Sequence, residues 1–445
     1  MNEIFTAVRP LDMRWGLLVL ALVTVGCGLR GDLAEAEKLL PREMARAKKN
    51  GWPMTAAEIS PPQVVADDKN GAEIIAHLGH EDLQKVIGTY RTASLDAKRD
   101  KSQIDTRALR EALDDASSAL KIVDRAADAP AWWFKFDYDL GPYLVFSHLA
   151  QMKEGAKMLT DRAMLHALEG DMDGCLSDLR KVRRIALGLD RQPFLIAALV
   201  QIAISSIEQK AMVDIAAQVH RNPATLAKLA SLAERKPVNV DLAHSLQGEF
   251  YMGLSLLRNF DAFGGLKAIQ ATMSPEDEAP KMPDASKLIR SGEPKDPLSR
   301  AYLTRHLQFW NEFAEARDEF DGDPVAMSEW LDAKAKQAEK NKSPSNTVTR
   351  ILNPVFVQAG MACLQPLTTT RLTRAYISAL QIKSRTGQYP QTLETEIDPF
   401  DDKPLRYKRT GDGFMIWSVS NDRKDNGGKR SDPEGGRDYV VEFKG

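Results

Sequence analysis

Apolar residues recur at helical spacing over most of the chain, from residue 72 to residue 260 and again from residue 299. This spacing places them on one face of an α-helix, so the pattern predicts a mainly helical protein. Short connections such as Gly170-Asp171-Met172 predict that neighbouring helices pack antiparallel. The predicted helices are residues 33–49 with a break or restart at Pro41, 72–90, 106–126, 144–168, 173–189, 193–220, 223–234, 240–260, 299–320 and 324–340.

One stretch is typical of a tetratricopeptide-type helix pair. Small residues at Ala163, Ala167 and Gly170 would let two helices approach, and Gly170-Asp171 would form the turn between them. The unit does not recur at a fixed period, which argues against a regular solenoid. We therefore predict an irregular antiparallel helical-repeat domain over residues 31–260.

Composition divides the remainder of the chain. Paired glycines, an acidic run and several prolines predict a linker over residues 261–298. A helical extension over residues 299–366 follows it, and a small α+β module occupies residues 367–445. A chain of 445 residues is too long for one ordinary hydrophobic core, so more than one domain is expected.

In the C-terminal module the spacing of apolar residues changes from the helical period to the alternation typical of strands. Apolar positions between residues 372 and 383 fit one helical face, and Gly387 supplies a left-handed end. Alternating residues then predict strands at 405–409, 414–419 and 438–443, with Gly411 and Gly413 in a hairpin turn between the first two. The pattern predicts a helix followed by an antiparallel sheet.

This order of features resembles the C-terminal half of the major pseudopilins of type II secretion, and the chain is similar to envelope proteins of Planctomycete-type bacteria. The resemblance implies a pilin-like fold for the module. It does not extend to the N-terminus, which has no prepilin-peptidase site of the family type, so assembly as a pilin subunit is not expected. The matching features are the turn Gly387-Gln388-Tyr389-Pro390, the segment Asp398-Pro399-Phe400, Tyr407 at a strand end and Ser418 before an Asp- and Gly-rich loop.

The resemblance also implies a bound calcium ion in the loop between the last two strands. Calcium takes several oxygen ligands from carboxylates, amides and carbonyls. A solvated turn, neutralised by the basic residues within and beside it, explains the same composition and stays open as an alternative. The candidate ligands are Asp422, Asp425, Asn426, Asp432 and Asp438.

An apolar run of about fifteen residues lies near the start of the chain, within the range of a signal-peptide core. Arg9 and Arg14 precede it, which predicts that residues 1–30 are a signal or anchor segment and that the bulk of the chain lies outside the cytoplasm, tethered to the membrane in the cell envelope. Val25-Gly26-Cys27 resembles the end of a lipoprotein signal, which would make Cys27 the lipidated residue. An uncleaved anchor is one alternative, and a buried helix of a cytoplasmic domain is another.

Charge and motifs exclude several classes of function. The formal net charge of −2 gives no basic excess of the kind that predicts nucleic-acid binding. Three cysteines without a Cys-x-x-Cys pair argue against a cysteine zinc site, and no nucleophile elbow or phosphate-binding loop is present. We expect a scaffold or interaction protein with a protein partner, in a secretion-like assembly as one setting, rather than an enzyme.

An aromatic cluster between two predicted helices supports a different function. Its rings would offer a stacking platform for a sugar or peptide, beside the carboxylates Asp137 and Asp139. The chain would then be an extracytoplasmic enzyme or carbohydrate-binding protein. A plug that fills the gap between helical layers needs no ligand, because each buried ring contributes about 1.5–3 kcal/mol, and is the favoured interpretation. The platform residues are Trp132, Trp133, Phe134 and Tyr138.

Overall fold

The computed structural model describes residues 28–59, 65–100, 103–265, 284–320, 323–340, 359–430 and 437–444. These residues are mostly helical and carry one small three-stranded antiparallel sheet near the C-terminus, which confirms the predicted fold class at this level. The predicted signal or anchor segment lies outside the described residues apart from its last three positions, and so does Cys27.

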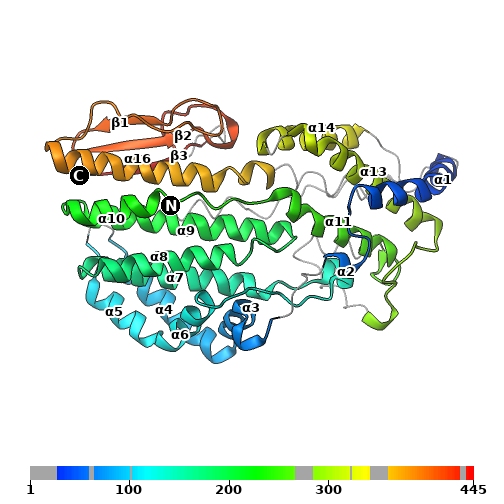
Figure 1. Cartoon of the computed structure of the whole chain (residues 1–445), viewed down its shortest axis with the longest axis horizontal. Helices are drawn as coiled ribbons and strands as arrows, with labels where there is room; N and C mark the ends of the chain where they lie inside the picture. Colours follow the sequence, from blue (N-terminus) through cyan, green and yellow to red (C-terminus); the bar gives the residue numbers. More distant parts are fainter. Residues whose placement is uncertain are drawn as a thin grey trace.

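The helices form a layered stack that ends in the sheet (Figure 1). Successive layers hold α4 to α6, then α7 and α8, then α9 and α10, and last α16 beneath the strands. The members of this stack are α3 (Gly71–Ala76), α4 (Glu81–Ala97), α5 (Thr106–Asp115), α6 (Ser117–Ala127), α7 (Ser147–Leu168), α8 (Met172–Leu187), α9 (Leu195–Val219), α10 (Pro223–Ala233) and α16 (Gln365–Thr386).

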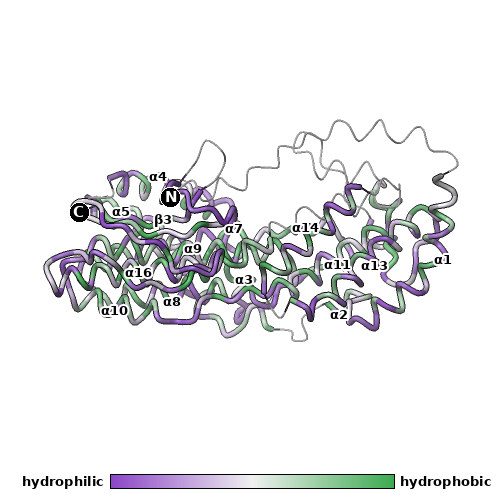
Figure 2. The backbone as a smooth tube through the Cα atoms, turned by 90° about the horizontal axis from the view of Figure 1, so that it is seen from above, coloured by the Kyte–Doolittle hydropathy of each residue, from purple (hydrophilic) through white to green (hydrophobic). Residues whose placement is uncertain are grey.

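A second group of helices extends the molecule along its long axis. Seen from above, it lies toward one end, while α8, α10 and α16 lie toward the other (Figure 2). One contiguous cluster of buried side chains joins the two groups. The members of the second group are α1 (Gly28–Lys49), α2 (Ala56–Ile59), α11 (Leu242–Arg258), α13 (Pro297–Ala316) and α14 (Pro324–Lys340).

Helix α9 is the centre of the stack. It packs against α7, α8, α11 and α16, and its apolar residues are buried around most of its circumference. Among the described residues it is the one helix whose length and composition would suit a membrane span. A helix that is surrounded by other helices is apolar on all sides for the same reason, and α9 is a core helix of this kind.

Helix α1 runs through Pro41 without the predicted break. Proline removes the helical donor of the Glu37 carbonyl, and packing of α1 along α13 offsets this cost through other contacts. The Thr304 hydroxyl donates to the carbonyl of Ala36 at 2.9 Å, and the Asn311 amide donates to the carbonyl of Glu43 at 3.0 Å. Tertiary packing therefore overrides the local tendency of proline to end a helix.

Two stretches that the pattern predicts as single helices are each divided. A 3-10 turn at His77–Gly79 separates α3 from α4, and Gln84 caps it by donating to the carbonyl of Leu78 at 2.6 Å. Ala116 separates α5 from α6, with ψ near 11°. In both places the break lets the two helices follow different neighbours.

The C-terminal module closely follows the predicted order. Gly387 ends α16 with φ of 76°, and the sheet has the order β1 (Arg406–Thr410), β2 (Gly413–Ser418), β3 (Tyr439–Phe443). Gly413 lies so close to the carbonyl of Phe443 that a Cβ atom there would overlap it. Tyr376 of α16 packs on Phe414 of β2, with ring centroids 5.2 Å apart. The sheet thus covers one side of α16, while α9 and α10 cover another.

The described second half of the predicted linker is docked on α11. The Asn259 side chain donates to the carbonyl of Ile289 at 3.1 Å and accepts from its backbone N–H at 2.5 Å. Arg258 donates to the carbonyl of Gly292 at 2.9 Å, and Leu288 joins the core. This part of the predicted linker is therefore held in place from residue 288 to residue 292.

Candidate functional site

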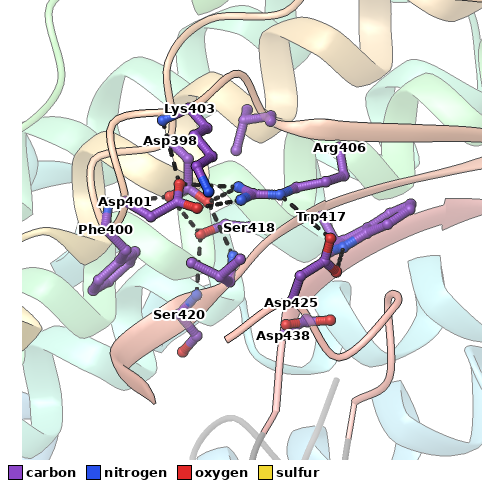
Figure 3. Close-up of polar contacts among 12 residues, drawn as sticks. Asp398, Phe400, Asp401, Lys403, Arg406, Trp417, Ser418, Ser420, Asp425 and Asp438 are labelled. Carbon is purple, nitrogen blue, oxygen red and sulfur yellow. Dashed lines mark hydrogen bonds and ion pairs between the residues drawn. The ribbon is translucent and has the colours of Figure 1, made fainter. Parts of the chain in front are cut away.

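A buried carboxylate, Asp398, organises the loop end of the C-terminal module (Figure 3). It has no exposed surface and accepts four hydrogen bonds. Ser418 and the backbone N–H of Phe400 donate to Oδ1 at 2.8 and 3.2 Å, and the backbone N–H of Val419 and Arg406 donate to Oδ2 at 2.9 and 2.8 Å. Four donors supply the stabilisation that a buried charge requires.

The local sequence folds to place Asp398 in this position. Its backbone N–H donates to the carbonyl of Lys403 at 2.6 Å, and the N–H of Asp402 donates to the carbonyl of Asp398 at 3.0 Å. Asp402 adopts a positive φ of 57°, which short polar side chains tolerate. The resulting tight turn brings the chain directly back into β1, where Arg406 lies beside the carboxylate.

Arg406 links three carboxylates. Its two terminal nitrogens bind both oxygens of Asp401, and its Nε lies 3.7 Å from Oδ2 of Asp425. Burial alone would raise the pKa of Asp401, but hydrogen bonds from Arg406 outweigh it and hold that pKa below its usual value. A planar guanidinium suits such bidentate contacts. The predicted calcium loop is therefore joined to β1 through one arginine.

Four of the five predicted calcium ligands lie in the described part of this loop, and Asp432 lies outside the described residues. Oδ1 of Asp425 accepts from Trp417 Nε1 at 2.8 Å and from the N–H of Gly427 at 2.9 Å. Asp438 accepts from the N–H groups of Asn426 and Gly428 at 3.4 and 2.8 Å. Asp422 accepts from the Asn426 amide at 3.1 Å. These carboxylates shape the loop by accepting its own donors.

The charges in this loop bear on whether calcium fits. Burial raises the pKa of Asp438, and the neighbouring charges of Asp425 and Asp422 raise it further against the effect of two backbone hydrogen bonds. Such crowding of negative charge is what a cation relieves. In the described part of the chain, however, no group of three or more acidic, histidine or cysteine side chains is close enough to hold one metal ion. The described ligands form an incomplete set without Asp432.

The aromatic cluster mostly belongs to the core. Phe134 and Tyr138 are only 3% and 2% exposed, so neither ring has a face open to a ligand. Trp132 is held between two glycines, because a Cβ atom on either Gly71 or Gly188 would overlap its ring. This packing supports the plug rather than a stacking platform for three of the four predicted residues.

Trp133 is half-buried, with Lys135 Nζ 5.7 Å from its ring centroid, and its Nε1 is buried without a hydrogen-bond partner. Its backbone is fixed by Asn70, which is fully buried. The Asn70 amide donates to the Trp133 carbonyl at 2.6 Å, and Asn70 Oδ1 accepts the Trp133 N–H at 2.9 Å. One partly open ring on a fixed backbone does not by itself form a platform.

The two carboxylates near this cluster converge on an arginine. Arg290 lies 3.1 Å from Asp137 and 2.7 Å from Asp139. Asp139 is 2% exposed and also accepts from the Tyr251 hydroxyl at 2.6 Å, while burial and that carboxylate raise the pKa of Tyr251. These acids hold the docked segment beside α11 and are not arranged as a general acid–base pair.

The pKa values of several buried cysteine and histidine side chains elsewhere are shifted in the direction that burial produces. Burial raises the pKa of Cys175 and of Cys363 to about 12, and lowers the pKa of His148 and of His306 to about 4. A nucleophilic thiol needs the opposite shift. His306 has a structural role, since its Nε2 lies 3.0 Å from the carbonyl of Phe250.

The sequence did not predict the central role of Asp398 and Arg406, although the Asp-Pro-aromatic segment that begins at Asp398 was one of the features that resemble pseudopilins. It also missed Gly71 and Gly188, whose lack of a side chain admits Trp132. Comparison of the chain with protein-family models, with curated proteins and with solved structures found no match.

Proposed function

We propose that this chain is a membrane-tethered scaffold or interaction protein outside the cytoplasm, with a pseudopilin-like C-terminal module fixed to an irregular helical-repeat domain. The observation that carries the proposal is the core shared between the two parts. Helix α16 packs on α9 and α10 and also on β2 and β3, within one contiguous cluster of buried residues. The module is therefore a rigid cap of the helical stack.

Both sides of α16 are covered, which has a consequence for assembly. A pilin-type subunit needs a helix face free to pack on other copies, and here Arg374 binds the end of α10 instead, donating to the carbonyls of Ala233 and Arg235 at 2.8 and 2.9 Å. The faces of α16 are therefore occupied, and we expect a partner to bind the helical stack. A secretion-like assembly would meet the chain through that stack.

The α7–α8 pair supports the helical-repeat interpretation. Gly170 forms the turn with φ of 85°, and Asp171 caps α8 by accepting the N–H of Gly174 at 2.9 Å. Paired helices of this kind present grooves for segments of partner proteins.

Location is tested first, in cells that express the full chain. A β-lactamase fused to the C-terminus should confer resistance, and the chain should remain with the membrane after alkaline extraction. A chain with residues 15–29 deleted is the control and should lose both properties. Resistance that is absent from the full-length fusion would refute the proposed location. A Cys27→Ala variant that keeps its membrane association would favour the uncleaved anchor over lipidation.

Partner binding is tested by site-specific photo-crosslinking in the same cells. Val145 and Leu95 are large apolar residues that are 69% and 57% exposed, so both are suitable positions for the photoreactive residue. A scaffold should give one discrete adduct that competes with excess unlabelled chain. Equal, diffuse labelling from both positions would contradict a specific partner.

We also propose that the loop of Asp422, Asp425 and Asp438 binds calcium together with Asn426 and Asp432. The crowding of negative charge described above supports this proposal. Because Trp417 donates to Asp425, its fluorescence should respond to calcium. Titration of the full chain in detergent should show a fluorescence change and a higher melting temperature that chelator reverses and Asp425→Asn abolishes. Asp412→Asn, at an exposed hairpin position, is the matched control. An unchanged melt at millimolar calcium would refute the site.

A further inference from the structure

One face of α8 carries a stripe of positive charge. Arg180 lies three and four residues before Arg183 and Arg184, and Leu187 lies four and three residues after them, which brings all four to the same side of the helix. Like charges at these spacings destabilise a helix. The opposite face is used for packing and includes Val182 and Ile185, each without exposed surface.

This stripe forms one wall of a hollow of about 430 Å³. The other wall is the segment that follows α10 and contributes Arg235 and Lys236. The residues that line the hollow therefore include five cations, with Leu187 as the apolar member and no carboxylate among them. The chain as a whole has a net charge of −2, so this is a local concentration of positive charge.

The nearby acids neutralise only part of this charge. Arg184 lies 2.7 Å from Asp128, and Arg183 lies 3.9 Å from Glu208. Burial raises the pKa of Glu208 to about 7, so it carries a partial charge at neutral pH, and its Oε2 makes no hydrogen bond.

Two further acids near the hollow are engaged elsewhere. Asp173 binds Lys228 at 2.8 Å, and Asp190 accepts from Gln201. Within the described residues the side chains of Arg180, Arg235 and Lys236 make no hydrogen bond or ion pair. Burial lowers the pKa of Arg235, and the charges of Arg180 and Arg183 lower it further.

The walls of the hollow are fixed before any ligand arrives. Arg183 donates to the carbonyl of Lys236, and Arg374 of α16 holds the carbonyls of Ala233 and Arg235. A site that is already ordered loses less conformational entropy on binding.

A second hollow of about 370 Å³ adjoins the first and shares Leu187 with it. Its lining is polar and includes Gln192, which is 3% exposed and whose Oε1 has no hydrogen-bond partner. An unpaired buried acceptor is costly unless a donor reaches it. The other polar residues of this lining are Asp190, Gln201, Asn239, Asp241 and Ser245.

We propose that these two adjoining hollows, named the α8 groove, together bind a phosphate ester of a small hydroxyl-bearing molecule. The phosphate lies among Arg180, Arg183 and Arg235, whose planar forks match its oxygens. The hydroxyl groups extend past Leu187 and donate to Gln192 and its polar neighbours.

The test is a calorimetric titration of the full chain in nonionic detergent with glucose 6-phosphate, inorganic phosphate and glucose as probes. Glucose 6-phosphate should bind more tightly than either fragment. The double variant Arg180→Gln with Arg235→Gln should weaken binding by about tenfold or more, since it removes charged hydrogen bonds. Arg317→Gln, at an exposed position directly after α13 and far from α8, should bind as the unaltered chain does.

Further arms of the experiment identify the source of the phosphate. Binding to phosphatidylglycerol vesicles that the double variant loses, without binding to the soluble probes, would keep the phosphate site and assign it to a lipid headgroup. Two results would overturn the proposal. One is equal affinity of the unaltered chain and the double variant for every probe. The other is binding of a polyglutamate peptide without binding of any phosphate probe, which would assign the groove to an acidic protein segment.

Discussion

The guanidinium of Arg406 donates to Oδ2 of Asp398 over 2.8 Å, and the Asp398 side chain has no exposed surface. The pair joins β1 to the turn that precedes it and to the end of β2, where Ser418 and Val419 also donate to the carboxylate. Because the negative charge is fully buried, its loss of hydration has to be offset by these donors together.

We therefore predict that Arg406→Leu destabilises the chain by about 3 kcal/mol or more, since it leaves the buried carboxylate of Asp398 without its cation. Urea denaturation followed by circular dichroism measures the change. Lys408→Leu removes the same charge from an exposed position of the same strand and should alter the unfolding free energy by less than about 0.5 kcal/mol. Similar values for the two variants would mean that the pair contributes no more than a surface charge.

Trp132 leads to a second prediction. Gly188→Ala should destabilise the chain by about 1–3 kcal/mol, because the new methyl group would overlap the indole ring and force it to move. A shift in tryptophan emission should accompany the loss. Gly88→Ala is the matched control, since no atom lies within 4 Å of the position its Cβ would take in α4. That variant should be more stable by up to about 1 kcal/mol.

The pH dependence of Glu208 gives a third prediction. Burial raises its folded pKa to about 7 from an ordinary value of 4.5, so between these values the folded state holds a proton that the unfolded state has lost. Its contribution to stability is complete below pH 4.5 and is lost as the pH rises to 7, by about 1.4 kcal/mol per unit.

Glu208→Gln removes this titration, and the measurement is the difference in unfolding free energy between the two proteins at pH 5, 6 and 7. His148 and His306, with pKa values of about 4, act in the opposite sense but are present in both proteins and cancel. A difference that does not change with pH would contradict the assigned pKa.

A fourth prediction concerns the joint between α16 and α10. Arg374→Leu removes both donors to the carbonyls at the end of α10, so the amides of residues 234–240 should exchange with deuterium several-fold faster. The amides of β1 to β3 should be unaffected. Arg385→Leu, at the exposed end of the same helix, is the control. Uniform acceleration throughout the chain would point to general destabilisation instead.

The elements that depend on local signals were predictable from the sequence. Pro324 and Lys340 bound α14 as the pattern predicts, and Gly387 ends α16 through its positive φ. Elements that depend on distant partners were not predictable. Pro41 lies inside a continuous helix because α1 packs along α13, and Ala116 interrupts a strongly periodic run because α5 and α6 have different neighbours.

The candidate sites follow the same distinction. The acids around Asp425 and Asp438 lie in one short loop, so the sequence brings them together without knowledge of the fold. The groove on α8 is different, since Arg180 and Arg183 meet Arg235 only after α9 and α10 have carried the chain back. The spacing of residues within one helix cannot predict that these three arginines lie close together.

Because α16 packs on α9 and α10, the core can be completed only after α16 has been synthesised. Helix α9 ends at residue 219 and α16 begins at residue 365. At about 5–20 residues per second, roughly 7–30 s of synthesis separate them. During that interval the sides of α9 and α10 that α16 will cover face water or a chaperone. A chain cut short before its last quarter keeps them exposed, which makes it a substrate for proteolytic quality control rather than a smaller working protein.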